Sequence, residues 1–244
     1  MEIDETINRW FEETADSINA KDNTNSPVDA LCFSVVPLAH NYCNAVLILL
    51  KNNKKLPAMA LLRVLGELSL RFLWCLYKDN PAKESIDVRI ERWKKHTFKE
   101  GVKRLNKLLL CANPEDSQHL QDQIAFLKKE IETIGHQHLP EKSFYNSLDE
   151  LPELYKKELY PRLYNNFNQA IHPDLKVFTD LMKQVGNKRI FSDDIDEVGI
   201  KSLKKHCATR AFLILSFVRL HYDLDYEGLK SEYSEIQQKL SKET

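Results

Sequence analysis

Glycine is scarce in this sequence of 244 residues, which contains 6 glycines, and proline is also infrequent, with 9. These two residues form most tight turns and interrupt regular structure. So few of them argue against a sandwich or barrel of many short strands and against long loops. No window alternates convincingly between apolar and polar residues, as a half-buried strand would. The sequence therefore favours helices.

Net charge is almost absent as well. The chain has 35 lysines and arginines against 36 acids, a formal charge of −1, so no global field draws the whole chain to nucleic acid or to an anionic membrane. The five cysteines include no C-x-x-C pair, and most lie in apolar surroundings. We expect reduced, buried thiols rather than disulfides or a zinc site. The acidic N-terminal sequence has no features of a secretory signal, so we predict a cytoplasmic protein.

The usual catalytic motifs are also missing. The sequence has no phosphate-binding P-loop, no dinucleotide fingerprint, no serine-hydrolase elbow and no H-E-x-x-H zinc motif. Glu132, His136 and His138 could supply metal ligands, but they leave a helix end for a polar loop, so we interpret them as solvated side chains. We therefore predict no cofactor and no metal site.

Helical periodicity runs through nearly the whole chain. It predicts helices at 1–20, 29–52, 57–79, 83–111, 115–134, 154–172, 174–186, 195–224 and 226–241. Asp29 or Ser26 can cap the second helix, and Pro57 suits the first turn of the third. The expected fold is all-α, a single bundle of about eight to ten helices over 1–244. Its parts are an N-terminal helix and linker (1–28), a core bundle (29–225) and a C-terminal helix (226–244).

Two helices in this pattern are almost as apolar as membrane spans. Residues 31–50 contain no charged residue, and 58–77 contain three. Their length suits a bilayer, but charges at the middle of such a span are costly. The charges and polar interruptions favour burial at the centre of a soluble bundle, together with a third apolar stretch at 206–222. We predict no membrane partner.

The charged residues of the 58–77 segment form a stripe. Arg63, Glu67 and Arg71 are spaced by four, which places them along one side of a helix with the carboxylate between two guanidinium groups. Two other stripes with the same spacing could complete a polar pocket: His40 with Asn44, and Tyr164 with Asn168 and His172. In this hypothesis Arg63, Glu67 and His172 are catalytic, and the binding residues are Arg71, His40, Asn44, Tyr164 and Asn168. The alternative is a buried network that fixes helix register and has no activity.

Two further groups of basic residues are open to interpretation. One stretch mixes cations with Trp93 and Phe98, as a nucleic-acid surface does, although an ordinary charged helix face has the same pattern. Its basic residues are Arg89, Arg92, Lys94, Lys95, Lys99, Lys103 and Arg104. The other group lies on the apolar C-terminal helix and includes His206 and Arg210. Arg210 could join the interior network, but the sequence alone does not decide this.

The third helix carries a resemblance to a known group. Pro57-Ala58 begins the helix, Leu61-Leu62-Arg63 follows with Glu67 four residues on, and a later tyrosine-rich helix from Tyr164 ends in His172-Pro173. In these features the chain resembles uncharacterised, all-helical bacterial proteins known only as a domain of unknown function. The resemblance implies an all-α fold and no agreed activity.

A looser likeness is to the HEPN helical ribonucleases and nucleotide-binding proteins, which are common in bacterial conflict systems. Their nuclease signature is an arginine followed by a histidine, with four to six residues between the two. Neither Arg92 with His96 nor Arg162 with His172 has that spacing.

Three functions therefore remain open, and enzymatic activity is not decided. The first is a helical protein with a polar Arg/Glu/His pocket, working in a conflict or defence system. The second is a metal-independent ribonuclease in which His172 is the general acid or base. The third is a structural protein that binds a protein partner or a second copy of itself. A shared site would place Arg63 or Glu67 within about 6 Å of His172, because packed helices lie about 8–10 Å apart.

Overall fold

In a computed structural model of the chain, the structure is described for residues 2–21, 26–77, 83–134, 149–153, 155, 182–185, 187–191 and 195–242. The chain forms two compact units. Unit 1 comprises Met1–Leu76 and Pro152–Thr244, and unit 2 comprises Tyr77–Leu151. Each unit is described by itself. The single domain over 1–244, with its boundaries after 28 and 225, stays a prediction.

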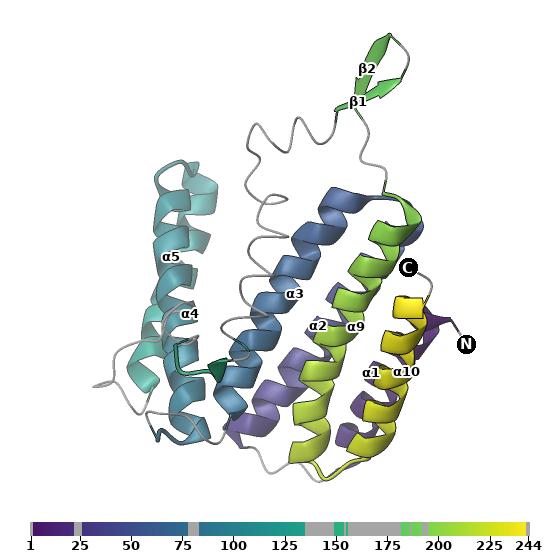
Figure 1. Cartoon of the computed structure of the whole chain (residues 1–244). Helices are drawn as coiled ribbons and strands as arrows, with labels where there is room; N and C mark the ends of the chain where they lie inside the picture. The colour runs from purple at the N-terminus through teal and green to yellow at the C-terminus, as the bar shows by residue number, and fades with distance from the viewer. Residues whose placement is uncertain are drawn as a thin grey trace. The chain divides into compact units, whose positions relative to one another are not determined.

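Unit 1 contains five of the described helices (Figure 1). They are α1 (Ile3–Asn19), α2 (Pro27–Lys51), α3 (Lys55–Leu76), α9 (Glu197–His221) and α10 (Tyr226–Lys242). All five were predicted from periodicity to within a few residues at each end. The predicted helical fold class is confirmed for the part of the chain that the structure describes, which contains one short β-hairpin besides its helices.

The polar residues between α2 and α3 explain where these helices begin and end. Ser26, and not Asp29, caps α2: its hydroxyl accepts a hydrogen bond from the Asp29 amide at 3.1 Å. At the other end Asn53 has a positive φ of 59°, a conformation that asparagine tolerates. The Lys54 amide then donates to the Leu49 carbonyl at 2.8 Å, which closes the helix end. This tight turn brings α3 back alongside α2.

The core of unit 1 is formed where α2, α3 and α9 pack against one another. Each of these helices contributes fully buried apolar residues, among them Cys32, Ala39, Cys43 and Val46 on α2, Leu62, Leu65 and Phe72 on α3, and Cys207, Ala211, Ile214 and Leu215 on α9. The prediction that the three apolar segments lie together at the centre is confirmed. Four of the five cysteines are buried free thiols, and Cys111 is exposed.

Polar contacts attach α1 and α10 to this core. Glu232 on α10 accepts hydrogen bonds from Arg9 at 2.6 Å and from the Trp10 indole at 2.7 Å, both on α1. Arg219 on α9 donates to the Thr14 hydroxyl at 3.0 Å and to the Asp225 carbonyl at 2.8 Å. These bonds satisfy side chains that packing removes from water.

The described part of unit 2 contains a hairpin of two helices, α4 (Ile86–Leu109) and α5 (Pro114–Thr133). Ser85 caps α4 by accepting from the Val88 amide at 3.3 Å, and Asn113 caps α5 by accepting from the Asp116 amide at 2.8 Å. Gly101 lies where the helices meet, because a Cβ atom there would come 2.9 Å from Cδ1 of Leu127.

One expectation about secondary structure is wrong. The predicted helix at 174–186 ends in a strand, β1 (Met182–Val185), which pairs antiparallel with β2 (Lys188–Phe191). Val185 pairs with Lys188, so the two residues between them in the sequence are Gly-Asn, a dipeptide that favours tight hairpins. The predicted helix at 154–172 falls almost entirely outside the described residues. The described part of the chain contains seven helices, fewer than the predicted eight to ten.

Of the described helices, α2 alone is long and apolar enough to cross a membrane, with a mean hydropathy of 1.5 over its most apolar window. This is weak evidence, because core helices of soluble proteins have the same composition. In the structure α2 packs against α1, α3 and α9. The cytoplasmic location and the absence of a membrane partner stay predictions.

The end of α9 is joined to the start of α2 by a buried carboxylate. Asp29, which is 5% exposed, accepts a hydrogen bond from the Tyr222 hydroxyl at 2.6 Å, and the His221 ring lies 3.5 Å away. Burial raises the pKa of Tyr222 above its ordinary value, and the bond to Asp29 raises it further. The Tyr222 hydroxyl therefore stays a donor to this carboxylate throughout the physiological pH range.

We expect Tyr222→Phe to lower the free energy of unfolding by about 1–2 kcal/mol, because it removes a hydrogen bond to a buried carboxylate. Urea denaturation followed by circular dichroism measures this loss. The control is Tyr226→Phe, which removes the hydroxyl of another half-buried tyrosine. Equal losses in the two variants would contradict the role given to the Tyr222–Asp29 bond.

Candidate functional site

The predicted stripe on α3 is a real feature of the helix. Nε of Arg63 lies 3.2 Å from Oε1 of Glu67, and the two side chains are 11% and 30% exposed. Arg71 continues the line one turn further and is half-buried. In the other direction the same spacing of four reaches Met59 and Lys55 at the start of α3. The stripe therefore begins at one end of the helix and runs into unit 1.

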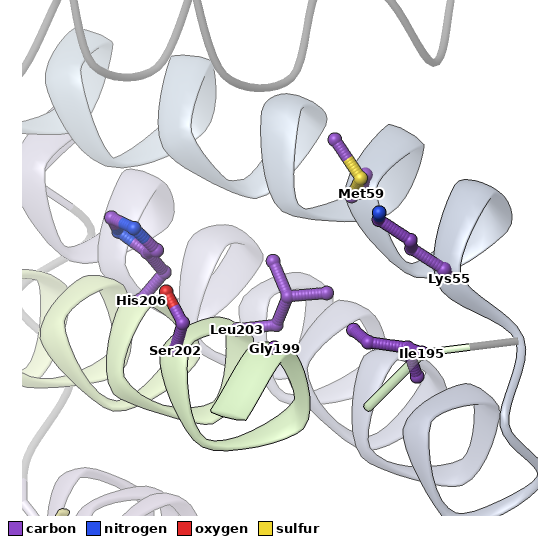
Figure 2. A pocket seen from close by; sticks show the side chains of 7 residues that line it. All are labelled: Lys55, Met59, Ile195, Gly199, Ser202, Leu203 and His206. Carbon is purple, nitrogen blue, oxygen red and sulfur yellow. The ribbon is translucent and has the colours of Figure 1, made fainter. Parts of the chain in front are cut away.

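A hollow lies at that end, between the first turns of α3 and α9. Figure 2 shows Lys55 and Met59 on α3 together with Ser202, Leu203 and His206 on α9. Ile195 and Gly199 complete the lining, and the volume is about 210 Å³. We call this hollow the α3–α9 pocket.

Local sequence explains why the pocket forms there. Asp196 caps α9 by accepting a hydrogen bond from the Gly199 amide at 2.8 Å. A Cβ atom on Gly199 would come 2.6 Å from Cγ1 of Ile195, so glycine lets this side chain fold over the first turn. The Ile195 amide donates to the Asn53 side chain at 3.4 Å. That bond links the residue before α9 to the turn before α3, so both helices begin at the pocket.

Arg210 lies one turn beyond His206 on the same side of α9. The spacing of four also connects it to Ser202, which gives α9 the stripe Ser202, His206, Arg210. Arg210 is 1% exposed, and among the described residues its Nη1 atom has no hydrogen-bond partner. Burial lowers the pKa of Arg210 to about 10, and nearby Tyr233 opposes this only in part. The group still carries a charge at neutral pH.

Three other buried arginines of the described chain have an acidic partner, which Arg210 lacks among the described residues. Arg63 pairs with Glu67, Arg92 pairs with Glu84, and Arg219 bonds to Thr14 and lies 3.4 Å from Glu13. A buried cation without a carboxylate is costly. Arg210 therefore differs from Arg63 and Arg219 of unit 1: among the described residues, no carboxylate compensates the cost of burying its charge.

Several predicted site residues do not join the stripe on α3. His40 stacks on Phe11 of α1 at 5.1 Å, and its Nε2 lies 3.3 Å from the side chain of Asn8, so it is engaged between α1 and α2. Asn44 is exposed on α2. Tyr164, Asn168 and His172 lie outside the described residues, so their convergence with Arg63 and Glu67 stays a prediction.

The pocket contains residues that sequence reasoning missed: Lys55, Ser202 and His206 were not assigned to a site. The spacing of four between Ser202, His206 and Arg210 was the available signal. Among the described residues, no cluster of histidine, cysteine or carboxylate side chains could hold a metal ion.

The predicted nucleic-acid surface needs a correction. Arg89, Arg92 and Lys95 are all less than 9% exposed, so they do not belong to an open face. Arg89 donates to the Tyr77 carbonyl at 2.5 Å, and Arg92 pairs with Glu84. Arg89 and Arg92 therefore bind groups of this chain and are not presented to a nucleic acid. Lys94, Lys103 and Arg104 are exposed, and Lys99 is half-buried.

Comparison with known families places the chain in one family. Residues 29–189 match a family of unknown function, DUF5677, and the chain belongs to that family. The matched range includes α2, α3 and the stripe from Lys55 to Arg71, and it confirms the resemblance to an uncharacterised domain of unknown function. A likeness to HEPN proteins is not shown. No curated protein and no solved structure matches the chain.

We expect Glu67→Gln to destabilise unit 1, because it leaves the Arg63 guanidinium without its counter-charge. Removing one partner of a fully buried pair costs about 3–5 kcal/mol, and the partial exposure of Glu67 reduces our expectation to about 1–2 kcal/mol. Chemical denaturation gives the value. Glu227→Gln is the control, since Glu227 pairs with Lys230 on the surface at 3.3 Å. A loss no larger than the control's would show that the Arg63–Glu67 pair is not structural.

Proposed function

We propose that unit 1 is a binding module for a small anionic ligand, held in the α3–α9 pocket through a phosphate or carboxylate group. Lys55, Ser202 and His206 would contact the anion, and Arg210 would supply a deeper charge. The observation that carries the proposal is the buried Arg210, which has no hydrogen bond or ion pair among the described residues.

The balance of charge supports an anion. Lys55 brings an ammonium group, Ser202 a hydroxyl donor and His206 an imidazole. Such groups recognise phosphate and carboxylate oxygens, most strongly where the donor is charged. Arg63 is already paired with Glu67, so the acid on the stripe does not neutralise Lys55 or Arg210.

Helix geometry supports a contribution from Arg210. Side chains in a helix lean towards its N-terminus, and for Arg210 that direction is the pocket. The pocket also lies at the beginnings of α3 and α9, where the positive ends of two helix dipoles are found. Asp196 and Glu197 offset part of this potential at α9, which leaves the side chains as the main source of positive charge.

Pocket size limits the class of ligand. A volume of about 210 Å³ is below the ~300–1,000 Å³ of pockets for drug-sized molecules. Met59, Ile195 and Leu203 provide apolar walls beside the polar groups. This suits a small molecule, or one anionic head group, that has a short apolar part.

The closed Arg63–Glu67 pair favours a second candidate, a structural protein whose polar residues only hold the helices in register. In that case Arg210 would stabilise the fold, and its replacement would lower the melting temperature. The two candidates make opposite predictions about its replacement.

We expect inorganic phosphate or acetate to raise the melting temperature of the wild-type protein relative to chloride at equal ionic strength, because a ligand that binds only the folded state stabilises it. Lys55→Met should reduce this effect by at least half. Lys54→Met is the matched control, because Lys54 is exposed and does not line the pocket. The same response in both variants, or no response to either anion in the wild type, would contradict binding in the α3–α9 pocket.

We expect Arg210→Met to raise the melting temperature in the absence of phosphate and to abolish the phosphate effect. Replacing a buried charge by an apolar side chain of similar size often stabilises by about 1–4 kcal/mol, and each kcal/mol corresponds to about 2–4 °C in a protein of this size. Differential scanning calorimetry measures both quantities. A lowered melting temperature with the phosphate effect intact would support the structural candidate instead.

A further inference from the structure

The basic side chains of α4 differ in exposure between the two halves of the helix. In the first half, Arg89, Arg92 and Lys95 are buried, whereas in the second half Lys103, Arg104 and Lys107 are exposed. Lys103, Arg104 and Lys107, together with half-buried Lys99, form what we call the basic face of α4. The charge of this face remains positive after Glu100 is counted. The chain as a whole has a charge of −1, so this face is a local feature and not a reflection of overall composition.

The three lysines of the basic face are directed away from α5. Gly101 marks the side of α4 that contacts α5, through Leu127. At about 100° per residue, Lys99, Lys103 and Lys107 lie on roughly the opposite side of α4. These three lysines are spaced by four and therefore lie in line along the helix.

The face is also hollowed. Glu100, Lys103, Arg104, Asn106 and Lys107 line a shallow depression with a volume of about 430 Å³. A hydrogen bond from Lys103 at 2.7 Å lowers the pKa of Glu100, and the charges of Lys103, His96 and Lys107 act in the same direction. The single acid in the depression thus lies among cations.

The like charges along this stripe oppose helix stability, and the Glu100–Lys103 ion pair offsets part of the effect. Like charges four residues apart destabilise a helix by about 0.2–0.5 kcal/mol per pair, and Lys99, Lys103 and Lys107 make two such pairs. Only Lys107 lies in the last turn of α4, where a cation favours the helix dipole. An anionic partner that spans the three lysines would relieve the repulsion.

We propose that the basic face of α4 binds the phosphate backbone of a nucleic acid without reading its sequence. Successive lysines on the stripe are separated by about 6 Å along the helix, a distance comparable to that between neighbouring phosphates of one strand. Lys103 and Lys107 contact phosphates as point charges, Arg104 donates to a phosphate oxygen, and Asn106 supplies a neutral donor beside them.

An anionic membrane fits this face less well. Membrane association would draw on the exposed Leu108 and Leu110 at the end of the hairpin. Glu115 and Asp116 are exposed a few residues further on, in the first turn of α5, and anionic lipids would repel them. A nucleic acid lying along the side of α4 opposite α5 avoids these acids.

The test is fluorescence anisotropy with the full chain and a labelled single-stranded RNA, measured over a range of salt concentrations. We expect the double variant K103E/K107E to weaken binding by about tenfold or more and to reduce the salt slope by about one unit for each lost phosphate contact. The control is K230E/K239E, two exposed lysines on α10 whose replacement changes the net charge equally. Circular dichroism checks that both variants keep the wild-type helix content.

Equal weakening in the two double variants would overturn the proposal, because it would reflect net charge alone. So would an absence of RNA binding at low salt together with binding to vesicles containing phosphatidylserine. Phosphate binding in the α3–α9 pocket is measured separately and does not depend on α4, so either proposal can fail without the other.

Discussion

The arrangement of unit 1 follows from one requirement: the apolar surfaces of α2, α3 and α9 must be removed from water together. α2, α3 and the second half of α9 are largely apolar, so their mutual packing also places charged side chains such as Arg63 and Arg210 inside. A buried charge is tolerated when it has a partner. The Arg63–Glu67 pair on α3 and the Tyr222–Asp29 bond between α9 and α2 are local solutions to that requirement.

Arg210 is the exception, and it connects the fold to the proposed function. Its guanidinium is buried in the same core but has no acidic partner among the described residues. A side chain that costs stability is expected to persist when it serves binding, since functional sites commonly trade stability for activity. The neighbouring pocket, with Lys55, Ser202 and His206, offers the place where an anion would complete the pairing.

Much of the fold could be predicted from the sequence, because helical periodicity and caps are local signals. The ion pair between Arg63 and Glu67 could be predicted for the same reason, as a spacing of four fixes the two side chains on one helix. The pocket could not: it depends on which sides of α3 and α9 meet, and these helices are far apart in the sequence. The hairpin β1–β2 was missed because four-residue strands give too short a pattern to separate from a helix end. Burial of Arg89 and Arg92 was missed because a charged helix gives no local sign of which cations find partners inside.

We propose that Arg210, a buried cation with no counter-charge among the described residues, gains one when an anion binds. Carbon-13 NMR of the arginine Cζ atoms, followed across the alkaline range, tests it most directly. In the free protein burial should hold the pKa of Arg210 below that of the other arginines, and saturating phosphate should move that pKa back up. An Arg210 side chain that titrates like the other arginines, with no change on adding phosphate, would show that it is already paired and would contradict the account.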